Sequence, residues 1–220
     1  MSEEHHDFWS RVAPKYDEVV DLQIGPATRS LLRDRVTKEG RLGALVEFGC
    51  GTGFYTSVLA EKADTVTATD LSPGMLALAR DRTAATNVTF RVEDCQKTSF
   101  PDAAFDTAFM SLVVHFTDPY ATLAEMRRIL KPGGTLIILS LDMPSLRGLD
   151  RIRSVARVVY CGATGYRVKP PRRFGANVMT EEQLRGALER SGFEVVHMET
   201  VRDAARSSNI PVEYVRAVKR

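Results

Sequence analysis

The chain has 220 residues, of which 44% are hydrophobic, and this size and composition suit one α/β domain with a buried core. Its formal net charge of +2 gives no reason to expect a nucleic-acid partner, and no apolar run approaches the ~20 residues of a membrane-spanning helix. The three cysteines, Cys50, Cys95 and Cys161, are too widely spaced to indicate a disulfide framework or a zinc site. The first residues, MSEEHHDFW, lack the basic and apolar regions of a signal peptide, so we expect a cytoplasmic protein.

Two helices are predicted before residue 40. Apolar side chains recur at near-helical spacing from Phe8 to Leu22 around Pro14, and residues 27–39 form a second amphipathic pattern that stops at Gly40. Taken alone, this pattern is that of helices packed on a sheet.

A glycine-rich stretch, ALVEFGCGTGFYT, follows at residues 44–56. Its apolar start leads into three alternating glycines, Gly49, Gly51 and Gly53, and then into a helical pattern. A short buried strand, a glycine turn and a helix in this order typically receive a nucleotide-type ligand at the strand's carboxyl end. Glycine suits such a turn because it accepts positive φ and lets a ligand approach the backbone.

The next predicted strand ends in a carboxylate, Asp70, 19 residues after Gly51. This is close to the offset of about 20 residues at which an acidic side chain binds ribose hydroxyls. The two G-x-G-x-x-G frames close on Thr56 and Phe54, which disfavours a dinucleotide. No G-x-x-x-x-G-K-[ST] loop is present, so a nucleoside triphosphate is also disfavoured.

Strands and helices alternate along the rest of the chain. Ser72 and Pro73 are predicted to begin one helix, and Thr180 begins another with a capping box. A helix over residues 120–130 is expected to end at a Lys-Pro-Gly-Gly stop signal. Strands are predicted at residues 88–92, 105–110, 135–140, 193–198 and 212–218.

Four blocks stand in order over roughly residues 40–140: VEFGCGTG, TATDLSPGMLALA, VEDCQKTSFPDAAFD and LKPGG. In this order and spacing they resemble the class I S-adenosylmethionine-dependent methyltransferases, most of all the small-molecule branch that includes the ubiquinone/menaquinone C-methyltransferases. The resemblance implies a single methyltransferase domain over residues 1–220, with a Rossmann-like, seven-stranded, doubly wound sheet. We expect the last strand to run antiparallel and to lie between the fifth and sixth strands.

The resemblance also implies that S-adenosylmethionine is the cofactor and that the glycine loop binds it. Gly49, Gly51 and Gly53 would hold the methionine portion, and Glu47 and Cys50 are grouped with them as cofactor-binding residues. No metal site is expected.

The ribose and adenine are expected to meet residues after the second and third strands. Asp70 would bind the ribose, and Leu71 beside it would offer adenine an apolar face. Met75 is open to two interpretations, namely contact with the cofactor and core packing. Asp94 and the Cys95 amide would recognise adenine, which needs one acceptor and one donor.

The N-terminal helices are similar to a family pattern, F-x-x-x-A-x-x-Y-D, over Trp9 to Asp17. By this resemblance residues 1–40 form a lid to which Trp9 and Tyr16 belong. Tyr16 would face the methionine end of the cofactor and is a candidate catalytic residue.

The end of the fourth strand, Ser111-Leu112-Val113-Val114-His115, should border the reacting methyl group, and Ser111 is a candidate cofactor-binding residue. His115 is the one histidine near this point, and it is interpreted either as a buried structural residue or as a general base. Asp106, near the start of the strand, is interpreted as structural. Residues 111–114 do not form the Asn/Asp-Pro-Pro-Tyr/Phe run of base and glutamine methyltransferases, which disfavours a nucleic-acid substrate.

Residues 142–178 form a basic insertion that the resemblance places over the acceptor site. Between Arg147 and Arg173 it has eight Arg or Lys residues and one acid, about +7, which leaves about −5 for the remainder. One helical face within it is apolar and is flanked by arginines. The helix is interpreted as an ordinary lid helix, as a membrane-surface helix, or as a cap that presents arginines to an anionic substrate.

The predicted function is direct in-line methyl transfer from S-adenosylmethionine to a small-molecule acceptor. The acceptor atom (C, O, N or S) is left open, and the acceptor is expected to be either aromatic or anionic. Peripheral membrane contact, with a quinone or lipid headgroup as acceptor, is an alternative. The oligomeric state is also left open. The rivals are a non-catalytic cofactor-binding subunit and a Rossmann oxidoreductase.

Overall fold

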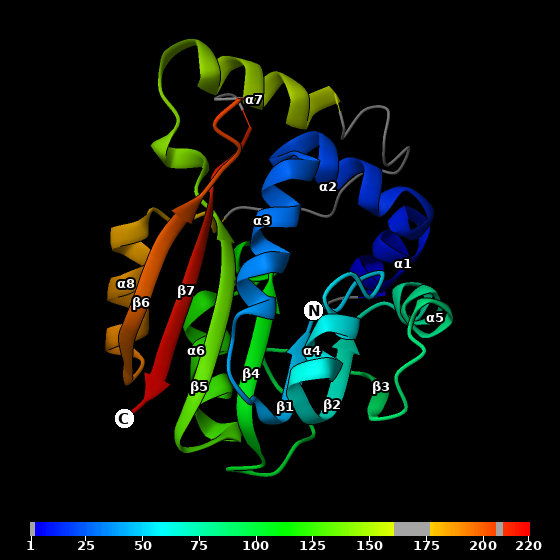
Figure 1. The fold of residues 1–220 in the computed structure, drawn as a ribbon. Helices are drawn as coiled ribbons and strands as arrows, with labels where there is room; N and C mark the ends of the chain where they lie inside the picture. The colour runs from blue at the N-terminus through cyan, green and yellow to red at the C-terminus, as the bar shows by residue number, and fades with distance from the viewer. Residues whose placement is uncertain (1–2, 161–176, 206–208) are drawn as a thin grey trace.

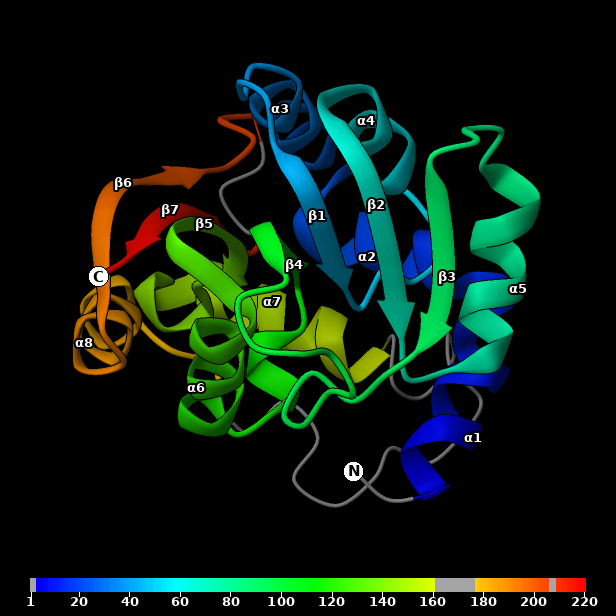
Figure 2. The same ribbon diagram turned by 90° about the horizontal axis from the view of Figure 1, so that it is seen from below.

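The computed structural model describes residues 3–160, 177–205 and 209–220, with the backbone alone for residues 3–7 and Val158. Cys161 and the predicted loop at 169–175 lie outside the described residues. Strands and helices alternate and build a sheet with helices on both faces (Figures 1 and 2).

The seven-stranded sheet has the order β3-β2-β1-β4-β5-β7-β6. Strands β1 to β5 pair in parallel, whereas β7 runs antiparallel to both β5 and β6. This confirms the predicted doubly wound sheet, including the antiparallel last strand between the fifth and sixth. The strands are β1 (Gly43–Phe48), β2 (Ala63–Asp70), β3 (Val88–Val92), β4 (Phe105–Ser111), β5 (Leu130–Leu141), β6 (Phe193–Val201) and β7 (Val212–Lys219).

Helices cover each face of the sheet with a separate apolar core. One core contains side chains of α3 (Pro26–Thr37), α4 (Thr56–Lys62) and α5 (Pro73–Arg82). The other contains side chains of α6 (Pro119–Ile129) and α8 (Glu181–Arg190). Neighbouring residues of a central strand enter opposite cores, as Ile137 and Ile138 of β5 do, because successive side chains point to opposite faces.

The remaining helical segments lie at the end of the sheet where the parallel strands finish (Figure 1). They are α1 (Glu3–Val12), α2 (Tyr16–Ile24), α7 (Gly148–Tyr160) and three short 3-10 turns, η1 (Ala13–Lys15), η2 (Val114–Phe116) and η3 (Met143–Ser145). The N-terminal helix predicted across Pro14 is therefore two helices joined by a 3-10 turn, since proline has no N–H to continue the helix.

The predicted helix starts are present in the structure. Ser72 Oγ accepts the N–H of Met75 at 3.2 Å, and Pro73 occupies the first turn of α5. Thr180 and Gln183 bond reciprocally in a capping box at the start of α8.

The fifth strand begins earlier than predicted. It starts at Leu130 instead of Thr135, because Leu130 already pairs with Phe105 and the register then shifts before Thr107 meets Thr135. The Lys-Pro-Gly-Gly signal therefore ends the helix, as predicted, and forms an irregularity inside the strand.

Asp106 is structural, as predicted. Its Oδ2 accepts the N–H of Ala44 at 2.8 Å, and its Oδ1 accepts a bond from Lys131 Nζ at 2.7 Å. These bonds tie β4 to the start of β1 at the edge opposite the glycine loop.

Candidate active site

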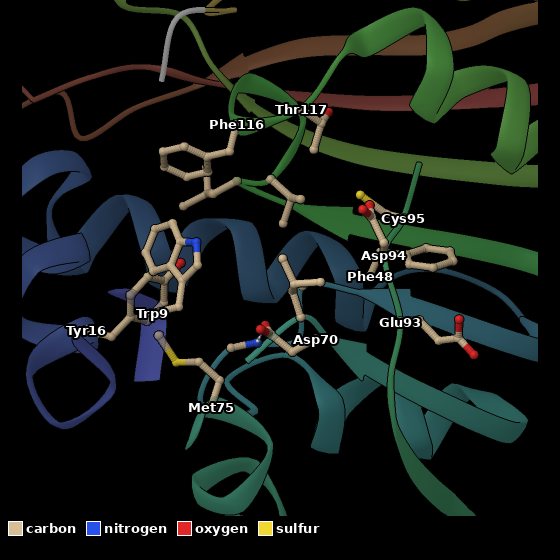
Figure 3. Close-up of a pocket in the computed structure, with 15 residues that line it drawn as sticks. Trp9, Tyr16, Phe48, Asp70, Met75, Glu93, Asp94, Cys95, Phe116 and Thr117 are labelled. Atoms are coloured by element: carbon tan, nitrogen blue, oxygen red, sulfur yellow. Dashed lines mark hydrogen bonds between the residues drawn. The ribbon is translucent and has the colours of Figure 1, made fainter. Parts of the chain in front are cut away.

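Two adjoining cavities lie where β1, β2 and β4 end, next to the point at which the strand order reverses between β1 and β4. Ligands of open α/β sheets bind at such a reversal. The first cavity encloses about 610 Å³ including its open mouth (Figure 3). Its lining residues are Trp9, Tyr16, Phe48, Gly49, Gly51, Asp70, Leu71, Met75, Glu93, Asp94, Cys95, Leu112, Val113, Phe116 and Thr117.

The glycine loop is pressed between two side chains and requires glycine at both contact points. Gly49 has φ +63°, and a Cβ there would lie 2.2 Å from Val113 Cγ2. Gly51 has φ +54°, and a Cβ would lie 3.3 Å from Tyr16 Cε1. Gly53 lines neither cavity. A Cβ on it would come within 3.1 Å of the Ala79 Cα, so Gly53 allows close packing on α5 instead of contact with a ligand.

Asp70 holds the glycine loop to the end of β2. Its Oδ2 accepts the N–H of Gly51 at 3.0 Å, and its Oδ1 accepts the N–H of Ser72 at 2.8 Å. A carboxylate has about four acceptor sites, so hydroxyl donors can be accepted besides these two amides. The structure thus places Asp70 in the middle of the first cavity with its orientation fixed (Figure 3).

The far end of the first cavity is formed by residues after β3. The Oδ1 of Asp94 accepts the N–H of Gln96 at 3.0 Å, which orients the carboxylate. Cys95 is buried, and burial raises the pKa of its thiol to about 12, with the charge of Asp94 acting in the same direction. The thiol is therefore neutral near pH 7. At this end of the cavity Cys95 can act through the packing of its side chain and through its backbone groups.

Aromatic side chains form the opposite end of the first cavity. The indole of Trp9 lies edge-on to Tyr16 and Phe116, with ring centroids 6.0 and 5.1 Å apart (Figure 3). Burial, with Asp70 acting in the same direction, raises the pKa of the Tyr16 hydroxyl, so it remains protonated and can donate a hydrogen bond. The lid that was expected at residues 1–40 thus contributes two of these three rings.

The second cavity, of about 390 Å³, lies on the other side of Tyr16 and the glycine loop. It is lined by a guanidinium group, that of Arg29, and a carboxyl group, that of Glu47, together with hydroxyl and apolar side chains. Its lining residues are Tyr16, Val20, Ile24, Arg29, Glu47, Gly49, Cys50, Gly51, Thr52, Phe54, Tyr55, Ser111 and Leu112.

Glu47 and Arg29 differ in how they are held. Glu47 accepts a bond from Thr56 Oγ1 at 2.7 Å, and burial raises its pKa to about 7, partly opposed by that bond. Arg29 is paired with Asp17 and Asp21, and its guanidinium lies 3.8 Å from the centroid of the Phe54 ring.

Four residues line both cavities and form the boundary between them: Tyr16, Gly49, Gly51 and Leu112. Leu112 has φ +56°, which is uncommon for a residue with a side chain and costs of order 1–3 kcal/mol. Its N–H bonds to Leu139 O at 2.8 Å, so β5 holds it in place. Such strain concentrates at functional sites.

His115 lies behind the cavities. It is buried, lines neither of them, and its Nδ1 has no hydrogen-bond partner. Burial lowers the pKa of His115 to about 3, so the imidazole is neutral. This geometry supports the structural interpretation and does not support proton transfer by His115.

The structure therefore brings all but two of the expected site residues to the cavity walls. Gly53 and His115 stand apart, and Glu47, Cys50 and Ser111 line only the second cavity. Leu112 and Val113 line the cavities at the end of β4, the segment that was expected to border the methyl group. Arg29, Glu93, Phe116 and Thr117 also line the cavities and were not anticipated. For Phe116 and Thr117 the available signal was their position just after β4, at the strand-order reversal.

A strand-end carboxylate, a glycine turn and a cavity at the strand-order reversal are the features of an α/β protein that binds a nucleotide-type ligand. A family model described as a methyltransferase domain matches residues 46–138. The malonyl-[acyl-carrier protein] O-methyltransferase of Serratia marcescens is 39% identical over 142 residues, 64% of this chain and 54% of that protein. The ubiquinone/menaquinone biosynthesis C-methyltransferase UbiE of Geobacter sulfurreducens is 32% identical over 160 residues, 67% of this chain and 62% of that protein.

Solved structures agree with this match. An S-adenosylmethionine-dependent methyltransferase from Mesorhizobium loti superposes with a TM-score of 0.64 at 25% identity, covering 89% of this chain and 97% of that one. The [4+2]-cyclase SpnF has a TM-score of 0.69 at 19% identity, covering 97% and 94%, and shares the fold. These matches support a class I S-adenosylmethionine-dependent methyltransferase with S-adenosylmethionine as its cofactor. The chain spans a little over half of the length of the two curated relatives.

Proposed function

We propose that the protein transfers a methyl group from S-adenosylmethionine to a small molecule by direct in-line displacement. The observation that carries the proposal is the pair of cavities joined at Tyr16, Gly49, Gly51 and Leu112. The first suits an adenosine, with carboxylates at its middle and far end. The second suits an amino-acid group, since a guanidinium and a carboxyl group face it.

Each part of the cofactor has a set of candidate residues. Asp70 would bind the ribose, and Asp94 and the Cys95 backbone would bind the adenine. Leu71 and Met75 would pack on the apolar faces of the adenine. Arg29 and Glu47 would hold the carboxylate and ammonium of the methionine portion. When bound, S-adenosylmethionine supplies an electrophilic methyl group, so the protein needs no covalent intermediate.

The contribution of the chain to the reaction is positioning and exclusion of water. Holding two reactants in line can be worth about 7–11 kcal/mol. Trp9, Tyr16 and Phe116 form an aromatic wall that excludes water, and the protonated hydroxyl of Tyr16 can orient an acceptor. Leu112 fixes the boundary at which the two cavities meet.

The wall residues favour an apolar, aromatic acceptor over an anionic one. Among the described residues, the first cavity is lined by three acids and no Arg or Lys, and Arg29 of the second is assigned to the methionine carboxylate of the cofactor. Aromatic rings of an acceptor can pack edge-on against such a wall. An acceptor dissolved in or attached to a lipid surface is the second form of the proposal, favoured by the exposed apolar face of α7 described below.

The test is a methyl-release screen in which the protein, S-adenosylmethionine and a metabolite library are incubated and S-adenosylhomocysteine is measured. We expect product with at least one neutral aromatic or quinol-like compound. Thermal protection by S-adenosylhomocysteine and not by NADH should accompany it. Protection without product from any compound would contradict methyl transfer and favour a non-catalytic cofactor-binding subunit.

A further inference from the structure

Helix α7 presents its apolar face to solvent and its polar face to the protein. Leu149, Ile152, Val155 and Val159 are 59, 66, 43 and 64% exposed, whereas Ser154 is only 1% exposed. A surface helix of a globular protein normally has the opposite arrangement, with the apolar stripe against the core. The apolar face predicted from the sequence is therefore present, but it does not pack on the domain.

The arrangement follows directly from the helical repeat. At 3.6 residues per turn the four apolar side chains fall within an arc of about 120°, and Ser154 lies almost opposite its centre. The helix is fixed to the body from the Ser154 side by Arg157, whose Nη1 donates to Leu22 O at 3.1 Å and to Asn209 Oδ1 at 2.7 Å. The apolar stripe therefore points away from the domain. In Figure 1, α7 lies beyond α2 at the end of the molecule that carries the cavities.

Arginines border the apolar stripe on both sides. On the same helical repeat Arg151 lies about 40° beyond one edge and Arg153 about 40° beyond the other, and both are exposed. The single acid of α7, Asp150, lies toward the body and is 4.0 Å from Arg153. If a second copy of the chain packed on this stripe, the arginines of the two copies would come together with no acid of α7 between them. Their like charges would repel each other.

An apolar stripe bordered by cations is complementary to an anionic lipid surface. Apolar side chains can enter the boundary between headgroups and acyl chains while the arginines reach lipid phosphates. We propose that α7 docks the protein on an anionic lipid surface through Leu149, Ile152, Val155 and Val159, with Arg151 and Arg153 at the phosphates. None of the helices in the described part of the chain has the length and apolar character needed to span a membrane.

Docking at α7 also bears on the acceptor. Helix α7 contacts α2, and α2 supplies Tyr16, Val20 and Ile24 to the cavity walls. A lipid surface against α7 would thus lie on the lid side of the site, where a lipid-soluble acceptor can enter. This last step rests on the proposed methyl transfer, whereas the docking itself does not.

The test is co-sedimentation of the full chain with vesicles of phosphatidylcholine, with and without phosphatidylglycerol. We expect binding to the phosphatidylglycerol vesicles at low salt and its loss as salt is raised. The double change Ile152→Ser/Val159→Ser should weaken binding at least about tenfold, because two exposed apolar side chains no longer enter the lipid. The change Arg151→Gln/Arg153→Gln should weaken it by about fivefold per arginine.

Matched controls separate the stripe from apolar or charged surface in general. Val196→Ser changes a 47% exposed apolar residue of β6, and Arg41→Gln removes an exposed arginine that pairs with Asp64. Neither should alter vesicle binding. Thermal protection by S-adenosylhomocysteine should persist in all four variants. A variant that loses this protection has a damaged cofactor site, and this result is distinguishable from a loss of vesicle binding alone.

Three results would overturn the proposal. The first is absence of co-sedimentation with anionic vesicles at low salt. The second is equal binding to neutral and anionic vesicles, unaffected by the arginine changes. The third is a dimeric mass in solution that the Ile152→Ser/Val159→Ser change converts to a monomer, because the stripe would then be an interface between copies of the chain.

Discussion

Asp17 and Thr52 are joined by a hydrogen bond in which Thr52 Oγ1 donates to Asp17 Oδ1 at 3.0 Å. The residues that precede them in the chain, Tyr16 and Gly51, also lie against each other. The same carboxylate also pairs with Arg29 and, at 2.5 Å, with Arg82 of α5. One side chain of α2 therefore connects the glycine loop, α3 and α5, next to Tyr16 at the boundary between the cavities.

Asp17→Ala should lower the free energy of unfolding by about 1–3 kcal/mol, because two arginines and the Thr52 hydroxyl each lose an acceptor, although Arg29 keeps Asp21. It should also weaken binding of S-adenosylhomocysteine by about tenfold, since Tyr16 is released from Gly51. Asp21→Ala is the matched control. It removes the other acid on Arg29, leaves Thr52 and Arg82 untouched, and should change cofactor affinity little. Equal effects of the two variants in calorimetry would contradict a special role for Asp17.

Trp9 should report cofactor binding by its own fluorescence. It is the single tryptophan of the chain, and its indole lines the first cavity. Titration with S-adenosylhomocysteine should give a saturable change in tryptophan emission, with the same midpoint as calorimetry. A Trp9→Phe variant should still bind the cofactor without that signal. Calorimetric binding with unchanged Trp9 emission would place the cofactor away from this wall.

Glu47 should make the empty protein less stable as pH rises through neutrality. Burial raises its pKa from 4.5 to about 7, so between these values the folded protein holds a proton that the unfolded chain has lost. The stabilisation is complete below pH 4.5 and is lost as pH rises through 7. Its upper bound is of order 3 kcal/mol.

The Glu47→Gln variant isolates this effect. The difference in unfolding free energy between wild type and variant, from urea unfolding across pH 5 to pH 8, should move in favour of the variant by ~1–3 kcal/mol. A difference that does not vary with pH would mean that Glu47 titrates at its ordinary pKa.

His115→Leu should leave methyl transfer within about threefold of wild type. The imidazole lines no cavity, and its buried Nδ1 has no partner, so an apolar side chain of similar size removes an unpaired polar atom. Unfolding free energy should stay within ~1 kcal/mol or rise. A fall in turnover of ~100-fold or more, the scale of a lost general base, would restore His115 as a catalytic residue.

The fold and half of the site were predictable because the backbone conformations that they require restrict which residue types can occupy those positions. Glycine at Gly49 and Gly51 is demanded by positive φ and close approach, and Asp70 ends a strand at a fixed distance from them. The four motif blocks therefore located the strands, the loop and the middle and far end of the first cavity, whereas Trp9 and Tyr16 came from the separate N-terminal pattern. The second cavity could not be predicted in this way, because Arg29 enters it only through the packing of α3 on the loop.

Gly53 and His115 do not line the cavities, although both follow functional strands closely. The direction in which each residue faces is set by tertiary packing and not by distance along the chain. Gly53 packs on Ala79, and the buried His115 ring lies with its centroid 4.0 Å from that of Phe116. The outward apolar face of α7 is similar, since amphipathic spacing predicts a helix without indicating which side meets the domain.

The central claim is that the cofactor lies across the first cavity with its ribose on Asp70. Calorimetric titration of S-adenosylhomocysteine into wild type and Asp70→Ala tests it most directly, with the exposed Asp64→Ala as control. We predict an affinity lower by one to two orders of magnitude for Asp70→Ala, as for the loss of charge-assisted hydrogen bonds, and unchanged affinity for Asp64→Ala. Equal affinity of wild type and Asp70→Ala would contradict the account.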